Sequence, residues 1–336
     1  MSTVAAEAPL FAVRDLHVHF PVRGTRGKVA VRALDGVDLD WRRGEVLGIV
    51  GESGCGKSTL GRTLMGLQPP TSGEVRFVGQ VVRKSDLRRM RRRVQMVFQD
   101  PYQSLNPRMT VGALVQEPLQ IHRVGKRGRE RVERALAALE GAGLRPPERF
   151  WDRYPHELSG GQRQRVVIAA ALVLEPEGLV CDEPVSALDV SIRAQVLHLL
   201  MHLREERDLG LLFITHDVGL AWALCDRIAV MYLGRVVEQG TTEQVLANPQ
   251  HPYTRALLSV VPTPLPRGGV RRTVLEGELP DAARLPTGCR FHPRCPSVFE
   301  RCPSDDPEAL LPAGEEGHGA ACWLLESAGR DNGAAV

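Results

Sequence analysis

Residues 51–58 read Gly51-Glu-Ser-Gly-Cys-Gly-Lys-Ser58 and match the pattern G-x-x-x-x-G-K-[ST] of a phosphate-binding loop. An apolar strand, predicted at residues 45–50, runs directly into this loop, and a helix is predicted at residues 57–65. Strand, loop and helix in this order form the context in which the pattern binds phosphate. The sequence therefore predicts an α/β fold that binds a nucleotide.

The loop residues have distinct expected roles. Its glycines let backbone N–H groups close around phosphate, and the start of the helix adds a favourable positive potential. Lys57 is expected to neutralise the β and γ phosphates of ATP, and the Ser58 hydroxyl to ligate Mg²⁺. The residues predicted to contact the nucleotide here are Gly51, Glu52, Ser53, Gly54, Cys55, Gly56, Lys57, Ser58 and Thr59.

Strands alternate with helices along much of the chain. Short apolar strands are predicted at residues 94–98, 179–182, 211–215 and 227–231, with a helix at residues 190–207. This alternation indicates a parallel sheet core covered on both sides. Two regions depart from it: strands at 11–20 and 74–78 indicate an antiparallel β subdomain, and residues 101–174 indicate a helical subdomain.

Two acids follow the predicted strand at residues 179–182. Asp182 is placed to hold Mg²⁺ through water, and Glu183 to polarise the water that attacks the γ phosphate. An apolar run followed by two acids is also common as a helix cap. The assignment becomes specific only because the phosphate-binding loop precedes it.

The segment Leu158-Ser-Gly-Gly-Gln162 distinguishes this chain from other nucleotide-binding proteins, because it matches the LSGGQ signature of the ABC (ATP-binding cassette) ATPases. The chain resembles that family also at Gln99 (Q-loop), at Ser186-Ala-Leu-Asp189 (D-loop) and at His216 (switch histidine). The resemblance implies catalytic roles for Glu183, His216 and Gln99, and Mg²⁺ contacts for Ser58, Gln99 and Asp182. It also implies ATP contacts for Gln99, Ser159, Gly160, Gly161, Gln162, Asp189 and His216, and adenine stacking for Phe20, whose alternative interpretation is a strand core residue.

The resemblance further implies that two ATPase domains dimerise head to tail around ATP. Residues Ser159, Gly160 and Gly161 then bind the γ phosphate held by the loop of the opposite subunit, through a hydroxyl and N–H groups at a helix start. Only one such domain is present in this sequence. A second ABC ATPase subunit is therefore an expected partner.

Within that family the sequence is most similar to the ATPases of dipeptide and oligopeptide importers, and specifically to the second of their two ATPase subunits. The resemblance rests on residues 98–107, 154–158, 184–191 and 248–258. It implies two transmembrane permease subunits, an extracytoplasmic substrate-binding protein and a peripheral location on the cytoplasmic face of the membrane. Related importers of nickel, opines, glutathione or antimicrobial peptides, and accessory ATPases of phosphonate degradation, are the alternatives.

Composition agrees with a globular protein that has no nucleic-acid partner. Lys and Arg number 43 against 40 Asp and Glu, so no overall charge favours nucleic acid, and the basic run at 83–93 is interpreted as a solvated edge. The longest apolar run, residues 166–174, is too short to cross a bilayer, and the N-terminus shows no secretion signal.

Four of the seven cysteines lie near the end of the chain: Cys289, Cys295, Cys302 and Cys322. Their spacing of five, six and nineteen residues lacks the C-x-x-C knuckle of most zinc sites, so zinc, an iron-sulfur cluster and free thiols all remain open. Resemblance to the peptide importers favours a [4Fe–4S] cluster, with a role separate from ATP chemistry. We expect an ATPase domain at 8–261, with its helical subdomain at about 101–174, and after a linker at 262–269 a cysteine-rich C-terminal module within 262–336.

The sequence departs from the family pattern in two ways. Ala170 stands where these proteins usually carry arginine, and Gly178 and Cys181 are unusual in the strand before Asp182. Neither departure removes a group that hydrolysis needs.

Overall fold

The computed structural model describes residues 8–24, 27–126, 128–261, 280–307, 310–313 and 316–326. The chain divides into two compact units. The first comprises Met1–Leu10, Trp41–Glu45 and Phe77–Phe213, and the second comprises Phe11–Asp40, Val46–Arg76 and Ile214–Val336.

The first unit contains a set of buried strands. Strand β6 (Val94–Val97) pairs in parallel with β7 (Gly178–Asp182), and β8 (Gly210–Thr215), most of which belongs to this unit, lies on the other side of β7. All five residues of β7 are buried, as expected for an inner strand of a parallel sheet. The first unit also contains a short strand, β5 (Gln80–Val81).

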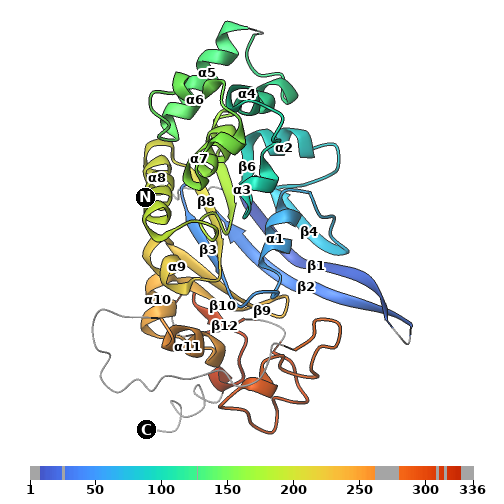
Figure 1. Cartoon of the computed structure of the whole chain (residues 1–336). Helices are drawn as coiled ribbons and strands as arrows, with labels where there is room; N and C mark the ends of the chain where they lie inside the picture. The colour runs from blue at the N-terminus through green and yellow to red at the C-terminus, as the bar shows by residue number, and fades with distance from the viewer. Residues whose placement is uncertain are drawn as a thin grey trace, which may run out of the picture. The chain divides into compact units, whose positions relative to one another are not determined.

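Helices make up most of the rest of the first unit. Helices α4 (Val111–Ile121), α5 (Arg129–Gly141) and α7 (Gly160–Leu172) pack against one another, and α7 also contacts β6 and α8 (Val190–Arg207) (Figure 1). Helix α7 therefore links the helical group to the strands. The remaining helical elements are α2 (Leu87–Arg93), α3 (Pro101–Ser104), α6 (Glu148–Trp151) and η1 (Pro155–Glu157).

The second unit contains two groups of strands. In one group the order is β2 (Gly27–Trp41), β1 (Phe11–Gly24), β4 (Ser72–Phe77), with the last residues of β2 and β4 belonging to the first unit. In the other, β3 (Val46–Val50) pairs in parallel with β9 (Arg227–Tyr232), which pairs antiparallel with β10 (Arg235–Thr241). The short strands β12 (Gly319–Ala320) and β11 (Leu311–Pro312) extend this group beyond β10.

Short helices complete the second unit. Helix α9 (Val218–Leu224) packs against β3, and α10 (Thr242–Ala247) packs against β10 and β9 (Figure 1). The others are α1 (Lys57–Leu64), α11 (Pro252–Ser259) and η2 (His292–Arg294).

The predicted α/β fold with a parallel core is confirmed, and the helix predicted at 190–207 has those bounds in the structure. Between residues 101 and 174, the described residues form helices and connections only, whereas the linker predicted at 262–269 lies outside the described residues. The described part of the C-terminal module belongs to the same compact unit as the phosphate-binding loop, and β12 pairs with β10. The predicted domain boundaries remain predictions.

Among the described residues, no helix is both long and apolar enough to span a membrane.

The unusual Gly178 has a packing reason. A Cβ atom at this position would lie 2.7 Å from Leu10 Cδ2 and 2.8 Å from the Trp41 ring, closer than real Cβ contacts. Trp41 is only 1% exposed, so its ring has little freedom to move away. Glycine at the start of β7 thus makes room for a buried indole.

We predict that Gly178→Ala destabilises the protein by about 1–3 kcal/mol, because the added methyl group overpacks the Trp41 site. The matched control is Gly141→Ala at the end of α5, where a Cβ would meet its nearest neighbour at 3.5 Å. Urea unfolding should show a lower midpoint for the first variant and an unchanged or higher midpoint for the second. Equal stability of the two variants would contradict the packing argument.

Candidate nucleotide-binding site

The phosphate-binding loop lies in the second unit between β3 and α1. All five residues of β3 are buried, so the loop begins from a fixed position. Helix α1 has no acidic residue in its first turn, and its N-cap Gly56 offers no side-chain cap. The first turn, which contains Ser58 and Thr59, is therefore a suitable place for an anion.

Only glycine fits at both ends of the loop. Gly51 has φ +151° and Gly56 has φ +107°, which residues with a Cβ rarely adopt. A Cβ on Gly51 would lie 2.2 Å from the Met231 carbonyl oxygen, and one on Gly56 would lie 2.2 Å from the Ala33 carbonyl oxygen. The loop backbone thus packs directly against β9 and β2.

The Lys57 side chain folds back over the loop. Its Nζ donates hydrogen bonds to the carbonyl oxygens of Gly51 (2.7 Å) and Glu52 (2.8 Å), and the residue is 5% exposed. These contacts hold an ammonium group against the loop, where the predicted β and γ phosphates would lie. The position of Lys57 therefore depends on the orientation of the Glu52 carbonyl.

Glu52 itself is held by two residues from the far end of the sequence. Its backbone N–H donates to the Tyr253 hydroxyl at 2.8 Å, and Arg294 donates two hydrogen bonds to its carboxylate at 2.7 and 3.0 Å. Sequence reasoning missed both residues. Tyr253 lies in the segment that supported the resemblance to peptide importers, but no sequence pattern indicated its contact with the loop.

The predicted catalytic acid lies in the first unit at the end of β7. Gln99 Nε2 donates a hydrogen bond to Glu183 Oε2 at 3.0 Å, so the structure brings these two predicted residues together. Asp182, the residue before, is 2% exposed. Glu183 has φ +48°, an uncommon backbone conformation that is often found at functional sites.

The signature segment forms the start of α7 in the first unit. Ser159 is the N-cap: its Oγ accepts from the Gln162 N–H at 3.3 Å, and the Gln162 side chain accepts from the Ser159 N–H at 3.0 Å. A Cβ on Gly161 would lie 2.4 Å from Ile192 of α8, so glycine there permits close helix packing. Ser159 is exposed, and Gly160 is partly exposed.

Of the other predicted residues, Asp189 and His216 lie at the ends of elements, whereas Phe20 lies within β1. Asp189 caps α8 by accepting from the Ile192 N–H at 3.0 Å, and it is exposed in the first unit. His216 follows the buried strand β8 and is exposed, and Phe20 is half-buried on β1, both in the second unit.

Magnesium fits the donor groups near these motifs. A hydroxyl (Ser58), an amide oxygen (Gln99) and a carboxylate (Asp182) are all hard oxygen ligands of the kind that Mg²⁺ prefers. Among the described residues, the only three potential ligands with atoms mutually within 4.8 Å are His17, His19 and Asp35. There, one Asp35 oxygen accepts from both imidazoles at 3.0 Å and the other pairs with Arg290, so hydrogen bonds account for the group.

The four C-terminal cysteines are close enough to influence one another. Burial, followed by the neighbouring thiols of Cys302, Cys322 and Cys295, raises the pKa of Cys289 to about 11. Burial also raises the pKa of Cys295 and of Cys322, and each again has thiol neighbours within the group. Among the described residues, however, no three of these thiols lie within 4.8 Å of one another.

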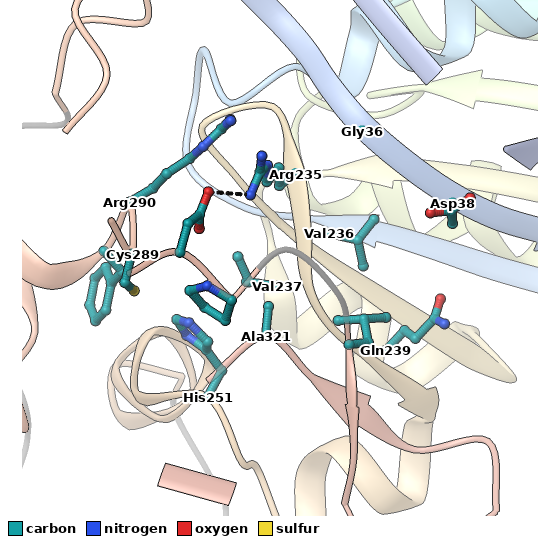
Figure 2. Close-up of a pocket in the computed structure, with 14 residues that line it drawn as sticks. Gly36, Asp38, Arg235, Val236, Val237, Gln239, His251, Cys289, Arg290 and Ala321 are labelled. Carbon is teal, nitrogen blue, oxygen red and sulfur yellow. Dashed lines mark hydrogen bonds and ion pairs between the residues drawn. The ribbon is translucent and has the colours of Figure 1, made fainter. Parts of the chain in front are cut away.

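A cavity of about 240 Å³ lies beside this module. Arg235, His251, Cys289 and Arg290 are among its lining residues, and Arg235 forms an ion pair with Asp306 at 2.6 Å (Figure 2). Of the four cysteines only Cys289 lines this cavity. It is therefore not the place where the four thiols converge.

Two family models match the chain: residues 34–186 match one described as ABC transporter, and residues 237–302 match one described as oligopeptide/dipeptide transporter, C-terminal region. The dipeptide transport ATP-binding protein DppF of Haemophilus influenzae is 46% identical over 96% of this chain and 99% of that protein. The oligopeptide transport ATP-binding protein AppF of Bacillus subtilis is 47% identical over 96% and 99%. A putative peptide import ATP-binding protein of Brucella ovis is 48% identical over 94% and 98%.

Solved structures of the same fold include cbiO1 from Clostridium perfringens, part of the ABC transporter complex cbiONQ. It is 31% identical, with a TM-score of 0.61 over 72% of this chain and 92% of that chain. A dimeric structure of MJ0796, a bacterial ABC transporter cassette, is 33% identical, with a TM-score of 0.62 over 69% and 98%.

The fold and the loop together define a P-loop nucleotide-binding protein with an ABC signature helix. By its identity to these relatives along nearly its whole length, the chain belongs to the ABC transporter ATPases, in the family of the peptide-import ATP-binding proteins.

We predict that Glu183→Gln preserves ATP binding and lowers turnover by about 10²–10⁴-fold, because it removes the carboxylate that activates water. The amide can still accept from Gln99, so the local fold is retained. Binding is measured by calorimetry and turnover by phosphate release from the chain assembled with its partner subunits. Glu206→Gln, on the exposed face of α8, is the control and should leave turnover unchanged. Substantial hydrolysis by the Glu183 variant would disprove the assignment.

Proposed function

We propose that the chain binds MgATP and hydrolyses it to power the import of dipeptides and oligopeptides through an ABC transporter. The observation that carries the hydrolytic part is the hydrogen bond between Gln99 and Glu183, which joins two motifs 84 positions apart at the end of a buried strand. The names of the relatives support peptides as the substrate class.

The proposed chemistry assigns one task to each group. Backbone N–H groups of the loop and Lys57 bind the β and γ phosphates. Ser58, Gln99 and Asp182 hold Mg²⁺, which supplies charge stabilisation on the phosphates. Glu183 accepts a proton from the attacking water, and His216 at the end of β8 contacts the γ phosphate.

The signature residues act on the ATP of another subunit. Ser159 is exposed and Gly160 is partly exposed, so the Ser159 hydroxyl and the start of α7 can meet a γ phosphate across an interface. The solved dimer of MJ0796 in a state bound to ADP and phosphate supports a dimeric arrangement. We propose a second ATPase chain as the partner, with ATP bound between the two.

Membrane partners complete the proposal. Two permease subunits carry the peptide path, an extracytoplasmic binding protein delivers peptide, and this chain acts at the cytoplasmic face through the permeases. The match of residues 237–302 to the oligopeptide/dipeptide transporter model favours peptide over nickel or opine import.

We predict that the isolated chain hydrolyses ATP slowly, since each complete site needs a signature from the opposite subunit. Adding the partner ATPase and the permeases should raise the phosphate-release rate per site by at least about tenfold, an increase of the size expected for a correctly positioned catalytic group. The isolated chain carrying Ser159→Ala serves as control and should be as slow as the unmodified chain. If the isolated monomer hydrolysed ATP at the rate of the assembled transporter, the proposal that each site needs a signature from the opposite subunit would be contradicted.

We also propose that the C-terminal module binds a [4Fe–4S] cluster through its four cysteines. The mutual influence of the thiols supports a common ligand. Because the pKa of Cys289 is about 11, cluster binding must displace thiol protons near neutral pH, as metal binding to thiols does.

We predict that protein purified without oxygen is brown and contains iron and acid-labile sulfide. Cys295→Ser should remove both, because it deletes one of the four ligands. Cys225→Ser is the matched control, since that thiol is buried outside the module. If the anaerobic protein contained zinc and no iron, the cluster assignment would be wrong and the cysteines would form a structural zinc site. If it contained neither metal, the cysteines would be reduced thiols.

A further inference from the structure

Glu52 places a carboxylate in a loop that is predicted to bind an anion. It lies next to Gly51, among the N–H groups that would surround phosphate, yet its side chain is a carboxylate. A free carboxylate there would repel the phosphates of ATP, because unit charges a few ångströms apart interact by several kcal/mol near a protein surface. The structure therefore needs a group that neutralises Glu52 and directs it away from the loop.

Arg294 meets both needs. Its guanidinium makes two hydrogen bonds to the Glu52 carboxylate, at 2.7 and 3.0 Å, a bidentate geometry that fixes direction as well as charge. The Arg294 side chain is only 6% exposed, whereas Glu52 retains 29%. The Arg294 guanidinium also lies over the ring of Tyr232 on β9, with its carbon 6.0 Å from the ring centroid.

The module holds Arg294 in place through two further attachments. Phe291 packs against Tyr232 and Tyr253, with ring centroids 5.3 and 5.5 Å apart, and so joins the 289–295 segment to β9 and α11. At the other end of the segment, Arg290 pairs with the buried carboxylate of Asp35 and donates to the Leu233 carbonyl.

Asp35, the partner of Arg290 in the second attachment, is held in its ionised form. Although its burial acts in the opposite direction, hydrogen bonds from Arg290, His19 and His17 hold the pKa of Asp35 well below its usual range. Asp35 therefore stays ionised, and the 289–295 segment is attached at both ends by arginine–carboxylate pairs.

Glu52 is thereby held at three points. Arg294 binds its carboxylate, Tyr253 accepts from its N–H, and its carbonyl accepts from Lys57 Nζ. We propose that Arg294 is a positioning residue for the phosphate-binding loop, and that the C-terminal module uses it to set the affinity of the chain for MgATP.

The proposal is tested by a double-mutant cycle on the full chain, using Arg294→Gln, Glu52→Gln and the two together. Loss of Arg294 leaves the Glu52 carboxylate unpaired beside the phosphates. Because losing a charge-assisted pair of this kind changes an equilibrium constant by about tenfold or more, we expect the MgATP Kd to rise by that factor. In the Glu52→Gln background the same arginine change should have little further effect, because no carboxylate remains to be neutralised.

Three further measurements separate positioning from general damage. Arg301→Gln is the matched control, since Arg301 lies in the same module but pairs with Asp305 at 2.6 Å and with Glu326. Arg294→Lys keeps the charge without the bidentate geometry and should recover part of the affinity. In the assembled transporter, Arg294→Gln should raise the KM for ATP and leave kcat nearly unchanged, because Gln99 and Glu183 are untouched.

The outcomes are decisive in either direction. An unchanged MgATP Kd in Arg294→Gln, or effects of the two substitutions that simply multiply, would overturn the proposal. If Arg294→Gln does not fold, Arg294→Lys in the two Glu52 backgrounds gives the same test. Iron content, measured on each variant, distinguishes the positioning role of Arg294 from an effect of a lost cluster. Weakened MgATP binding at an iron content equal to that of the unmodified protein supports the positioning role alone.

Discussion

Binding of phosphate by backbone N–H groups is the requirement on which this structure depends. Those groups face an anion only if the chain follows a path that residues with a Cβ cannot take, and Gly51 and Gly56 each pass within contact distance of a neighbouring carbonyl. The glycine positions themselves, however, contribute no side chain that would hold the loop. Support must therefore come from the buried strand β3 on one side and from residues outside the loop on the other.

That external support comes from the C-terminal part of the same unit. Tyr253 and Arg294 reach Glu52 from α11 and η2, while Arg290 reaches Asp35 on β2. Each contact joins a charged or polar group to the partner that satisfies it, so burial costs little. The proposed catalytic pair, Gln99 and Glu183, lies in the other unit, and its hydrogen bond involves none of these residues.

Local features were predictable from the sequence because each depends on neighbouring residues. The order of strand, loop and helix around residues 45–65, and the N-cap of α7 at Ser159, follow from short patterns with known physical causes. The contact between Gln99 and Glu183 agreed with the family resemblance. Arg294 was not predictable in this way: an arginine beside a cysteine in a polar segment carries no pattern that identifies a partner 242 positions earlier.

The separation between Glu52 and Arg294 also has a consequence for biosynthesis. Translation proceeds at about 5–20 residues per second, so roughly 10–50 s pass between the emergence of Glu52 and that of Arg294. During that interval the nascent chain already contains its glycine-rich loop. The contacts of Glu52 with Tyr253 and Arg294 form only after those later residues have been synthesised and have packed against the loop. The phosphate-binding loop therefore gains its full set of supporting contacts only near the end of synthesis.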